Sequence, residues 1–163
     1  MSLEVRLLAA GDDAQAAGAI VQQAYFALPG YPHDDEYDVI LGDVATRAAE
    51  TEVLVGVLDG RLVACLTYVA DQHRPHAEFD DAEAASFRYF GVDPSVQGNG
   101  VGEAMVQWCL DRARADGRTR IRIHTLETMP AAQRLYLRMG FQRDTDHDED
   151  WDGIRGLAFV CHL

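Results

Sequence analysis

Residues 91–102 read Gly-Val-Asp-Pro-Ser-Val-Gln-Gly-Asn-Gly-Val-Gly, and this stretch decides the predicted fold. A strand-like run over residues 86–92 ends before Pro94, which cannot donate to a sheet ladder. Gly98, Gly100 and Gly102 allow a ligand to approach the backbone closely and can direct successive N–H groups at one point. The helix predicted over residues 103–116 adds unpaired N–H groups and the positive end of its dipole. The pattern therefore predicts an anion site suited to a pyrophosphate.

Two common phosphate-binding motifs do not fit this stretch. A P-loop needs a lysine after its last glycine, and the chain contains no lysine. A dinucleotide fingerprint needs GxGxxG after the first strand, whereas these glycines follow GxGxG late in the chain. A glycine-rich turn that binds nothing is the remaining structural alternative.

Outward from the turn, the hydrophobic pattern alternates between strands and helices. Residues 53–58 and 62–69 form the clearest hairpin, because Asp59-Gly60 suits a type I′ turn. Both of these strands are apolar on both faces, so we expect helices to cover both sides of the sheet. The order predicts an α/β fold with one mixed sheet; the other expected strands are 5–8, 121–126, 141–145 and 157–162, and the other helices are 12–28, 37–49 and 130–139.

The composition indicates one globular domain, residues 1–163. A formal net charge of -13 argues against nucleic acid as a partner, because no basic stripe could replace phosphate counterions. The acidic residues are clustered, and they could attract a cationic amine or simply keep surface loops solvated.

No apolar run reaches membrane-spanning length and the N-terminus lacks a basic start, so we expect a cytoplasmic protein without a membrane partner.

The three cysteines, Cys65, Cys109 and Cys161, fit the same compartment. Their number is odd and none forms a CxxC pair, which disfavours a disulfide framework or a zinc site. We expect them to be small buried hydrophobic residues, and we expect no metal.

Two segments resemble the GNAT superfamily of GCN5-related N-acetyltransferases. Residues 97–102, Gln-Gly-Asn-Gly-Val-Gly, look like its Q/R-x-x-G-x-G/A motif for acyl-CoA. Residues 132–141, Ala-Gln-Arg-Leu-Tyr-Leu-Arg-Met-Gly-Phe, resemble its A-x-x-L-Y-x-x-x-G-F signature. The resemblance covers the element order of almost the whole chain, and it implies a single mainly antiparallel sheet of 6–7 strands with helices on both faces.

The resemblance also implies a donor, a reaction and a binding site. The donor would be acetyl-CoA, used as a co-substrate, and the acetyl group would pass to a primary amine. Phe90, Gly91 and Val92 would pair with the pantetheine arm, where a bulge parts their strand from residues 121–126. A main-chain N–H near Val92 could polarise the thioester carbonyl. Backbone N–H groups would hold the pyrophosphate, and these belong to Gln97, Gly98, Asn99, Gly100, Val101, Gly102 and Glu103.

Four side chains are candidates for chemistry or phosphate binding. Tyr136 matches the family tyrosine near the CoA sulfur and is a candidate general acid, although its apolar neighbours also suit a core position. His124 stands where some relatives carry a glutamate and is a candidate base, although a lone strand histidine is often structural. Arg134 and Arg138 could meet CoA phosphates or be ordinary surface arginines. The family often has an asparagine at the position of Met129, so one polar contact to the pantetheine arm is expected to be lost.

The segments expected to face the acceptor have no recognisable sequence signature. We expect residues 28–38, 71–85 and 144–153 to face it, and the acidic balance slightly favours a small cationic molecule. The resemblance is compatible with a homodimer. A non-catalytic acyl-CoA-binding or regulatory module on the same fold is the alternative function.

Overall fold

A computed structural model describes residues 2–163, and Met1 lies outside the described part. The chain alternates strands and helices in the predicted order. The strands are β1 (Leu3–Leu7), β2 (Glu52–Leu58), β3 (Arg61–Val69), β4 (Ala84–Val92), β5 (Arg120–Leu126), β6 (Gln142–Arg143), β7 (Glu149–Trp151) and β8 (Ile154–His162). The helices are α1 (Ala14–Phe26), α2 (Asp35–Gly42), α3 (Val44–Glu50), α4 (Val101–Ala115) and α5 (Pro130–Arg138), with short 3-10 turns η1 (Pro94–Val96) and η2 (Thr145–His147).

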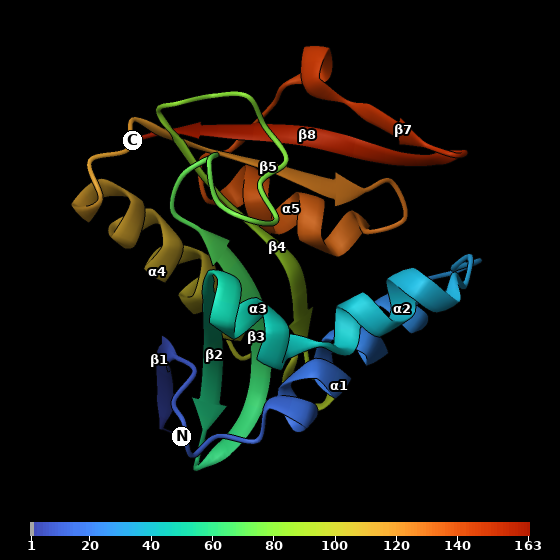
Figure 1. Cartoon of the computed structure of the whole chain (residues 1–163), viewed down its shortest axis with the longest axis vertical. Coiled ribbons are helices and arrows are strands. Elements are labelled where there is room, and N and C mark those ends of the chain that lie inside the picture. The colour runs from blue at the N-terminus through green and yellow to red at the C-terminus, as the bar shows by residue number, and fades with distance from the viewer. Residues whose placement is uncertain (1) are drawn as a thin grey trace.

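The strands form one mainly antiparallel sheet in the order β1-β2-β3-β4-β5-β8-β6, with β7 also paired to β8 (Figure 1). Its single parallel contact, among the described residues, joins β4 to β5 in the middle of the sheet. The sheet has 8 strands, so the expectation of 6–7 is short by at least one. The additional strand is β7, which lies in an acidic segment expected to be a loop and pairs with β8 through Glu149, Asp150 and Trp151.

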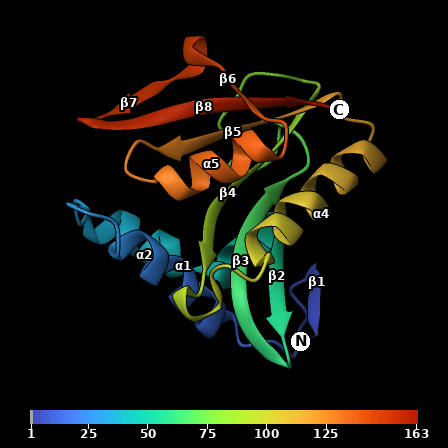
Figure 2. The same ribbon diagram turned by 180° about the vertical axis from the view of Figure 1, so that it is seen from behind.

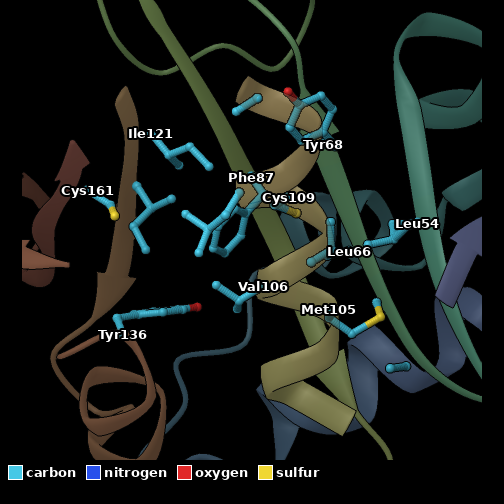
Figure 3. Packing of buried hydrophobic residues seen from close by; sticks show 14 of the residues in the cluster. Leu54, Leu66, Tyr68, Phe87, Met105, Val106, Cys109, Ile121, Tyr136 and Cys161 are labelled. Carbon is cyan, nitrogen blue, oxygen red and sulfur yellow. The ribbon is translucent and has the colours of Figure 1, made fainter. Parts of the chain in front are cut away.

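Helices cover both faces of the sheet, as expected. α1, α2 and α3 lie on the face seen in Figure 1, and α4 and α5 lie on the opposite face seen in Figure 2. The α4 side chains Met105, Val106 and Cys109 pack with Leu66 and Phe87 of the sheet (Figure 3). On the other face, a second buried cluster joins α1, α2 and α3 to the sheet; it includes Ala17, Val21, Leu41, Val44, Val55 and Cys65. The strands are therefore apolar on both sides because each side has its own core.

The β2–β3 hairpin turns as the sequence predicts. Asp59 and Gly60 have φ values of 50° and 83°, which are the two left-handed positions that a type I′ turn requires. The turn fixes the register of a hairpin that runs from Glu52↔Tyr68 to Leu58↔Arg61.

The helix expected over residues 37–49 is two helices. Asp43 interrupts it with φ -86° and ψ 66°, and its carboxylate accepts a hydrogen bond from the N–H of Thr46 at 3.2 Å, which caps α3. The break also follows from packing: a Cβ on Gly18 of α1 would lie 2.0 Å from the carbonyl oxygen of Gly42. The two helix backbones thus touch where α2 ends.

The strand expected over residues 141–145 is shorter than predicted. Only Gln142 and Arg143 pair with β8, because the chain then turns through η2 before returning as β7. Across the described residues, none of the helices is both long and apolar enough to cross a membrane.

Candidate active site

The glycine turn is open and leaves backbone N–H groups free. Gly98 and Gly100 have φ values of 86° and 75°, and apart from the adjacent residues no atom of the described chain lies within 4 Å of the place where a Cβ would stand on either. The first intrahelical bond of α4 runs from the N–H of Ala104 to the carbonyl of Gly100 at 3.0 Å. The N–H groups of the three preceding residues, Val101 to Glu103, therefore have no helical partner and lie at the positive end of the helix dipole. This geometry fits the predicted anion site.

Side chains do not fill the turn. Asn99 folds back so that its amide donates to the carbonyl of Val96 at 3.0 Å, and Gln97 is exposed. The turn is thus formed by backbone, with no side-chain cap on the first residue of α4. Any anion bound here would be held by main-chain groups.

The two arginines predicted near the phosphates have different surroundings. Arg138 forms an ion pair at 3.1 Å with Glu103 in the first turn of α4, and both side chains are exposed. Arg134 is exposed and has no ion pair within residues 2–163. Arg134 is therefore the freer cation of the two.

The central strands part beside this turn. β4 and β5 pair only at Ala84↔Arg120 and Ala85↔Ile121, so the remainder of β4, which carries Phe90, Gly91 and Val92, has no strand partner on the β5 side. β4 is also bulged, because Thr67 of β3 pairs with Arg88 whereas Cys65 pairs with Gly91. The predicted bulge and opening are both present.

Gly91 has a separate structural reason to be glycine. A Cβ there would lie 2.8 Å from the carbonyl oxygen of Ile20 and 2.9 Å from the Cα of Val21, both in α1. Its small size therefore lets α1 pack against β4.

The bulge decides which face each residue of β4 reaches. Phe87 and Phe90 belong to the core cluster on the α4–α5 face, whereas Tyr89 belongs to the cluster on the α1–α3 face. Arg88 also lies on that second face, with its guanidinium carbon 4.3 Å from the centre of the Tyr89 ring. Tyr89 has φ 53°, so the bulge places two consecutive side chains on one side of the sheet.

A cavity of about 770 Å³ occupies the opening. Its lining includes Phe90 of β4, His124 of β5 and Tyr136 of α5, which the sequence had singled out. It also includes parts of all three segments expected to face the acceptor: residues 29–32 with Asp34 and Tyr37, then Glu78, then residues 151–153. Residues of the glycine turn do not line the cavity, so the predicted phosphate site and the cavity are distinct places joined along β4.

Tyr136 lies at the α5 wall of the cavity. The residue is 4% exposed, and its ring packs against Phe87, Phe141 and Phe159 with centroid distances of 5.6 to 6.0 Å. Figure 3 shows the ring extending from α5 with its hydroxyl towards Val106 of α4. Burial raises the pKa of the hydroxyl well above its ordinary value of 10, and nearby Cys109 adds to this effect. The group therefore carries its proton at neutral pH.

His124 is held on both sides. Its Nδ1 lies 3.2 Å from the Glu78 carboxylate and its Nε2 lies 2.9 Å from the carbonyl oxygen of His147, while Phe79 stacks on the ring at 4.6 Å. Burial alone would lower the pKa of His124, but the hydrogen bonds to Glu78 and His147 and the charges of Glu78 and Glu149 raise it. Both ring nitrogens face oxygen acceptors, so this geometry favours an imidazolium.

Sequence reasoning missed the charged residues that join His124 in the cavity. Glu78 comes from the β3–β4 connection and lies 3.6 Å from Arg88 of β4. Tyr25 of α1 is buried on the cavity wall, and the pKa of its hydroxyl is raised by burial and by the nearby Tyr37. The one available signal was Arg88, a charged residue inside an otherwise apolar strand.

Met129 stands at the start of α5, also in the cavity wall, where it accepts a weak 3.5 Å hydrogen bond from the Thr125 hydroxyl. No side chain caps this end of α5. The cavity wall therefore has a methionine at the position where the family often has an asparagine.

Known structures share this architecture. A GCN5-related N-acetyltransferase from Kribbella flavida has 22% identity and a TM-score of 0.74 over 99% of this chain and 98% of its own. The Salmonella typhimurium protein yncA, solved with its cofactor acetyl-CoA, has 17% identity and a TM-score of 0.68 over 99% and 94%. A GNAT family acetyltransferase from Elizabethkingia anophelis with acetyl-CoA bound has 13% identity and a TM-score of 0.65 over 99% and 98%.

Comparison with curated protein sequences gives no match. The model of the acetyltransferase (GNAT) family matches residues 18–141, which include the glycine turn, the parted strands and most of the residues that line the cavity. The chain belongs to the GNAT acetyltransferase family.

Proposed function

We propose that the protein transfers an acetyl group from acetyl-CoA to a primary amine of a small acceptor. The observation that carries this proposal is the opening between β4 and β5, which holds a cavity and lies beside a free helix N-terminus. Family membership and the neighbours solved with acetyl-CoA support the choice of donor.

The residues present fit the donor. The N–H groups of Gly98 and of the residues from Gly100 to Glu103 have no backbone acceptor among the described residues and would hold the diphosphate, and Arg134 could add a charge contact. The predicted contribution of Gln97 and Asn99 is not supported, because their N–H groups already donate to the carbonyls of Pro94 and Val96, both at 3.3 Å. The unpaired edge of β4 at Phe90, Gly91 and Val92 would receive the pantetheine arm. Acetyl-CoA supplies the acetyl group as an activated thioester. In this arrangement, the acetyl end would reach the cavity from the α4–α5 face.

Tyr136 is proposed as the general acid. The departing sulfur needs a proton, and the Tyr136 hydroxyl donates to no described residue and keeps its proton at neutral pH. Its position on the cavity wall between α5 and β4 supports this role.

The proposal that His124 is the general base is not favoured by its contacts. A base needs a free nitrogen lone pair, whereas both ring nitrogens of His124 face oxygens. We propose instead that His124 positions Glu78, and that the amine loses its proton to water or to the Glu78 carboxylate.

The acceptor is proposed to be a small molecule whose amine is a cationic ammonium group before it reacts. Asp34, Glu127 and Asp152 line the cavity and are exposed, and the protein carries a net charge of -13. Such a field concentrates ammonium groups at the entrance.

The test measures release of free CoA thiol from acetyl-CoA across a panel of primary amines. We expect amine-dependent release, with N-acetylated product identified by mass spectrometry. A non-catalytic acyl-CoA-binding module would instead bind acetyl-CoA in a thermal-shift assay and show no stimulation by any amine. That second pattern would refute the proposed transfer.

A further inference from the structure

The cavity carries buried charge on the face covered by α1 and α2. Arg88, Glu78 and His124 converge there from β4, the β3–β4 connection and β5, and their side chains are 22%, 11% and 4% exposed. Glu78 lies 3.6 Å from Arg88 and 3.2 Å from His124. One carboxylate is therefore shared between two cationic side chains.

Arg88 is not fully satisfied by the protein. Its Nη1 donates to the carbonyl of His76 at 3.0 Å, and its Nε is too far from Glu78 for a good hydrogen bond. Its Nη2 forms no hydrogen bond of 3.5 Å or less in the described part of the chain, although the guanidinium also interacts with the hydroxyl of Tyr37. A guanidinium offers five N–H donors, so donors remain available on a side chain that lines the cavity.

Glu78 cannot neutralise both neighbours. The carbonyl oxygen of His147 can only accept, so Nε2 of His124 carries a proton. The contact of Nδ1 with the Glu78 carboxylate then favours a second proton on the ring. The inner part of the cavity thus has an excess of one positive charge.

Other carboxylates around the cavity lie at its rim. Asp34, Glu127, Glu149 and Asp152 are exposed, and Glu127 is 3.6 Å from Arg155. Solvent screens these groups more strongly than the buried cluster. The cavity is therefore acidic at the rim and cationic inside.

We propose that the acceptor is an amino acid, in the sense of a primary amine that also bears a carboxylate, and that Arg88 binds this carboxylate. This inference rests on the proposed acetyl transfer. A guanidinium matches the planar carboxylate with two parallel hydrogen bonds, and the neighbouring Glu78 disfavours a ligand of higher negative charge. Because Arg88 lies on the α1–α3 face and Tyr136 on the α5 side, a ligand held by Arg88 can extend its amine into the opening.

The test compares each acceptor with the same molecule lacking only its negative charge. The panel contains the common α-amino acids, two ω-amino acids (β-alanine and γ-aminobutyrate) and the carboxamide of each. For the preferred acid, we expect kcat/KM to exceed that of its amide by about 10- to 100-fold, the value of a charge-assisted pair. Comparison of the α-amino acids with the ω-amino acids shows the separation between amine and carboxylate in the preferred acceptor.

Arg88→Met should remove this preference by lowering kcat/KM for the acid to that of the amide, and Arg88→Lys should retain part of it. Arg143→Met is the matched control. Arg143 also stacks on an aromatic ring, Phe159 at 5.5 Å, and pairs with a carboxylate, Asp148 at 2.5 Å, but it does not line the cavity. The control should keep the full preference for the acid.

The proposal is overturned if the wild-type enzyme has the same kcat/KM for amides as for acids. It is also overturned if folded Arg88→Met loses kcat/KM equally for the acid and for its amide. Folding is checked by thermal unfolding, with Arg88→Lys as the second variant. Calorimetric binding of the acid and amide pairs in the presence of CoA separates this inference from acetyl transfer. Arg88-dependent binding of acids without thiol release from any amine refutes the transfer and keeps the carboxylate site. Absence of acid binding and of any preference for acids overturns the site.

Discussion

The glycine turn and the Arg88–Glu78–His124 cluster are two binding regions of one molecule, and they are built from different parts of the chain. The turn is a continuous segment whose available donors are backbone N–H groups, and its residues from Gln97 to Gly100 are exposed. The cluster joins three side chains from separate segments, and all three are largely buried.

Because of this difference, the two regions should respond differently to substitution. Backbone donors remain when most side chains are replaced, so the turn depends chiefly on its glycine conformations. The cluster depends on the identity of each side chain, because removing one charge leaves another unpaired. We therefore expect the donor site to tolerate substitution at the non-glycine positions of the turn and the acceptor site to change selectivity with single substitutions.

The largest effect should come from Gly100→Asp. The substitution places a negative charge at the free N–H groups and strains a backbone with φ 75°, so acetyl-CoA binding should weaken by more than about 100-fold. Gly117→Asp is the matched control, because Gly117 has φ 76° and equally open surroundings at the other end of α4. Calorimetry on both variants separates loss of the anion site from backbone strain. Equal binding by the two variants would contradict the placement of the diphosphate.

Tyr136→Phe should come next. Removing a general acid should lower kcat by about 100-fold or more while acetyl-CoA affinity stays within about threefold. The raised pKa of Tyr136 also predicts that the wild-type rate does not fall through ionisation of this group until well above pH 10. Steady-state kinetics with direct measurement of acetyl-CoA binding test both points. An unchanged kcat would show that the hydroxyl has no part in the reaction.

The cluster should make stability depend on pH. The folded pKa of His124 is raised above 6.5, so its contribution to stability is fully present below pH 6.5 and is lost as the pH rises through the folded value. Urea unfolding of the wild type and of His124→Asn, at several pH values from 5.5 to about 9, isolates this contribution as a difference. We expect the difference in unfolding free energy to shrink with rising pH. A difference that grows instead would mean that His124 is neutral in the folded protein.

The smallest effects should come from the arginines of α5. Arg138→Ala should change the free energy of unfolding by no more than about 0.5 kcal/mol, since its ion pair with Glu103 is exposed. Arg134→Ala should weaken acetyl-CoA binding more than Arg138→Ala, because Arg138 already has a partner. The comparison is best made at low salt, where surface charges act most strongly. A larger effect of Arg138 would show that its ion pair opens for the phosphates.

The features that depend on neighbouring residues were predictable from sequence. The Asp59-Gly60 turn and the glycine run of residues 97–102 require particular residue types at fixed spacing, so the sequence of each predicts its backbone conformation. The break between α2 and α3 was not predicted, because it depends on Asp43 capping α3 and on the approach of Gly18 to Gly42. Helix propensity depends on local sequence and does not reveal the approach of two residues that are distant along the chain.

The acceptor side of the cavity was less predictable for the same reason. The role of Arg88 depends on the bulge, which appears only in the pairing of β3 with β4. Glu78 lies in a polar loop with no motif, and only the folded chain brings it to Arg88 and His124. His124 was predicted to be a candidate base, but the two contacts that decide its protonation come from residues 46 and 23 positions away in sequence.

The contact between Gly18 and Gly42 has a mechanical consequence for how molecules enter. The hypothetical Cβ on Gly18 would overlap the backbone of α2, so the two helices already sit at the shortest separation their main chains allow. They should therefore move as one rigid wall, with no sliding between them. Access for an acceptor would then depend on the tip of the β7–β8 hairpin at Trp151 to Gly153, which also lines the cavity.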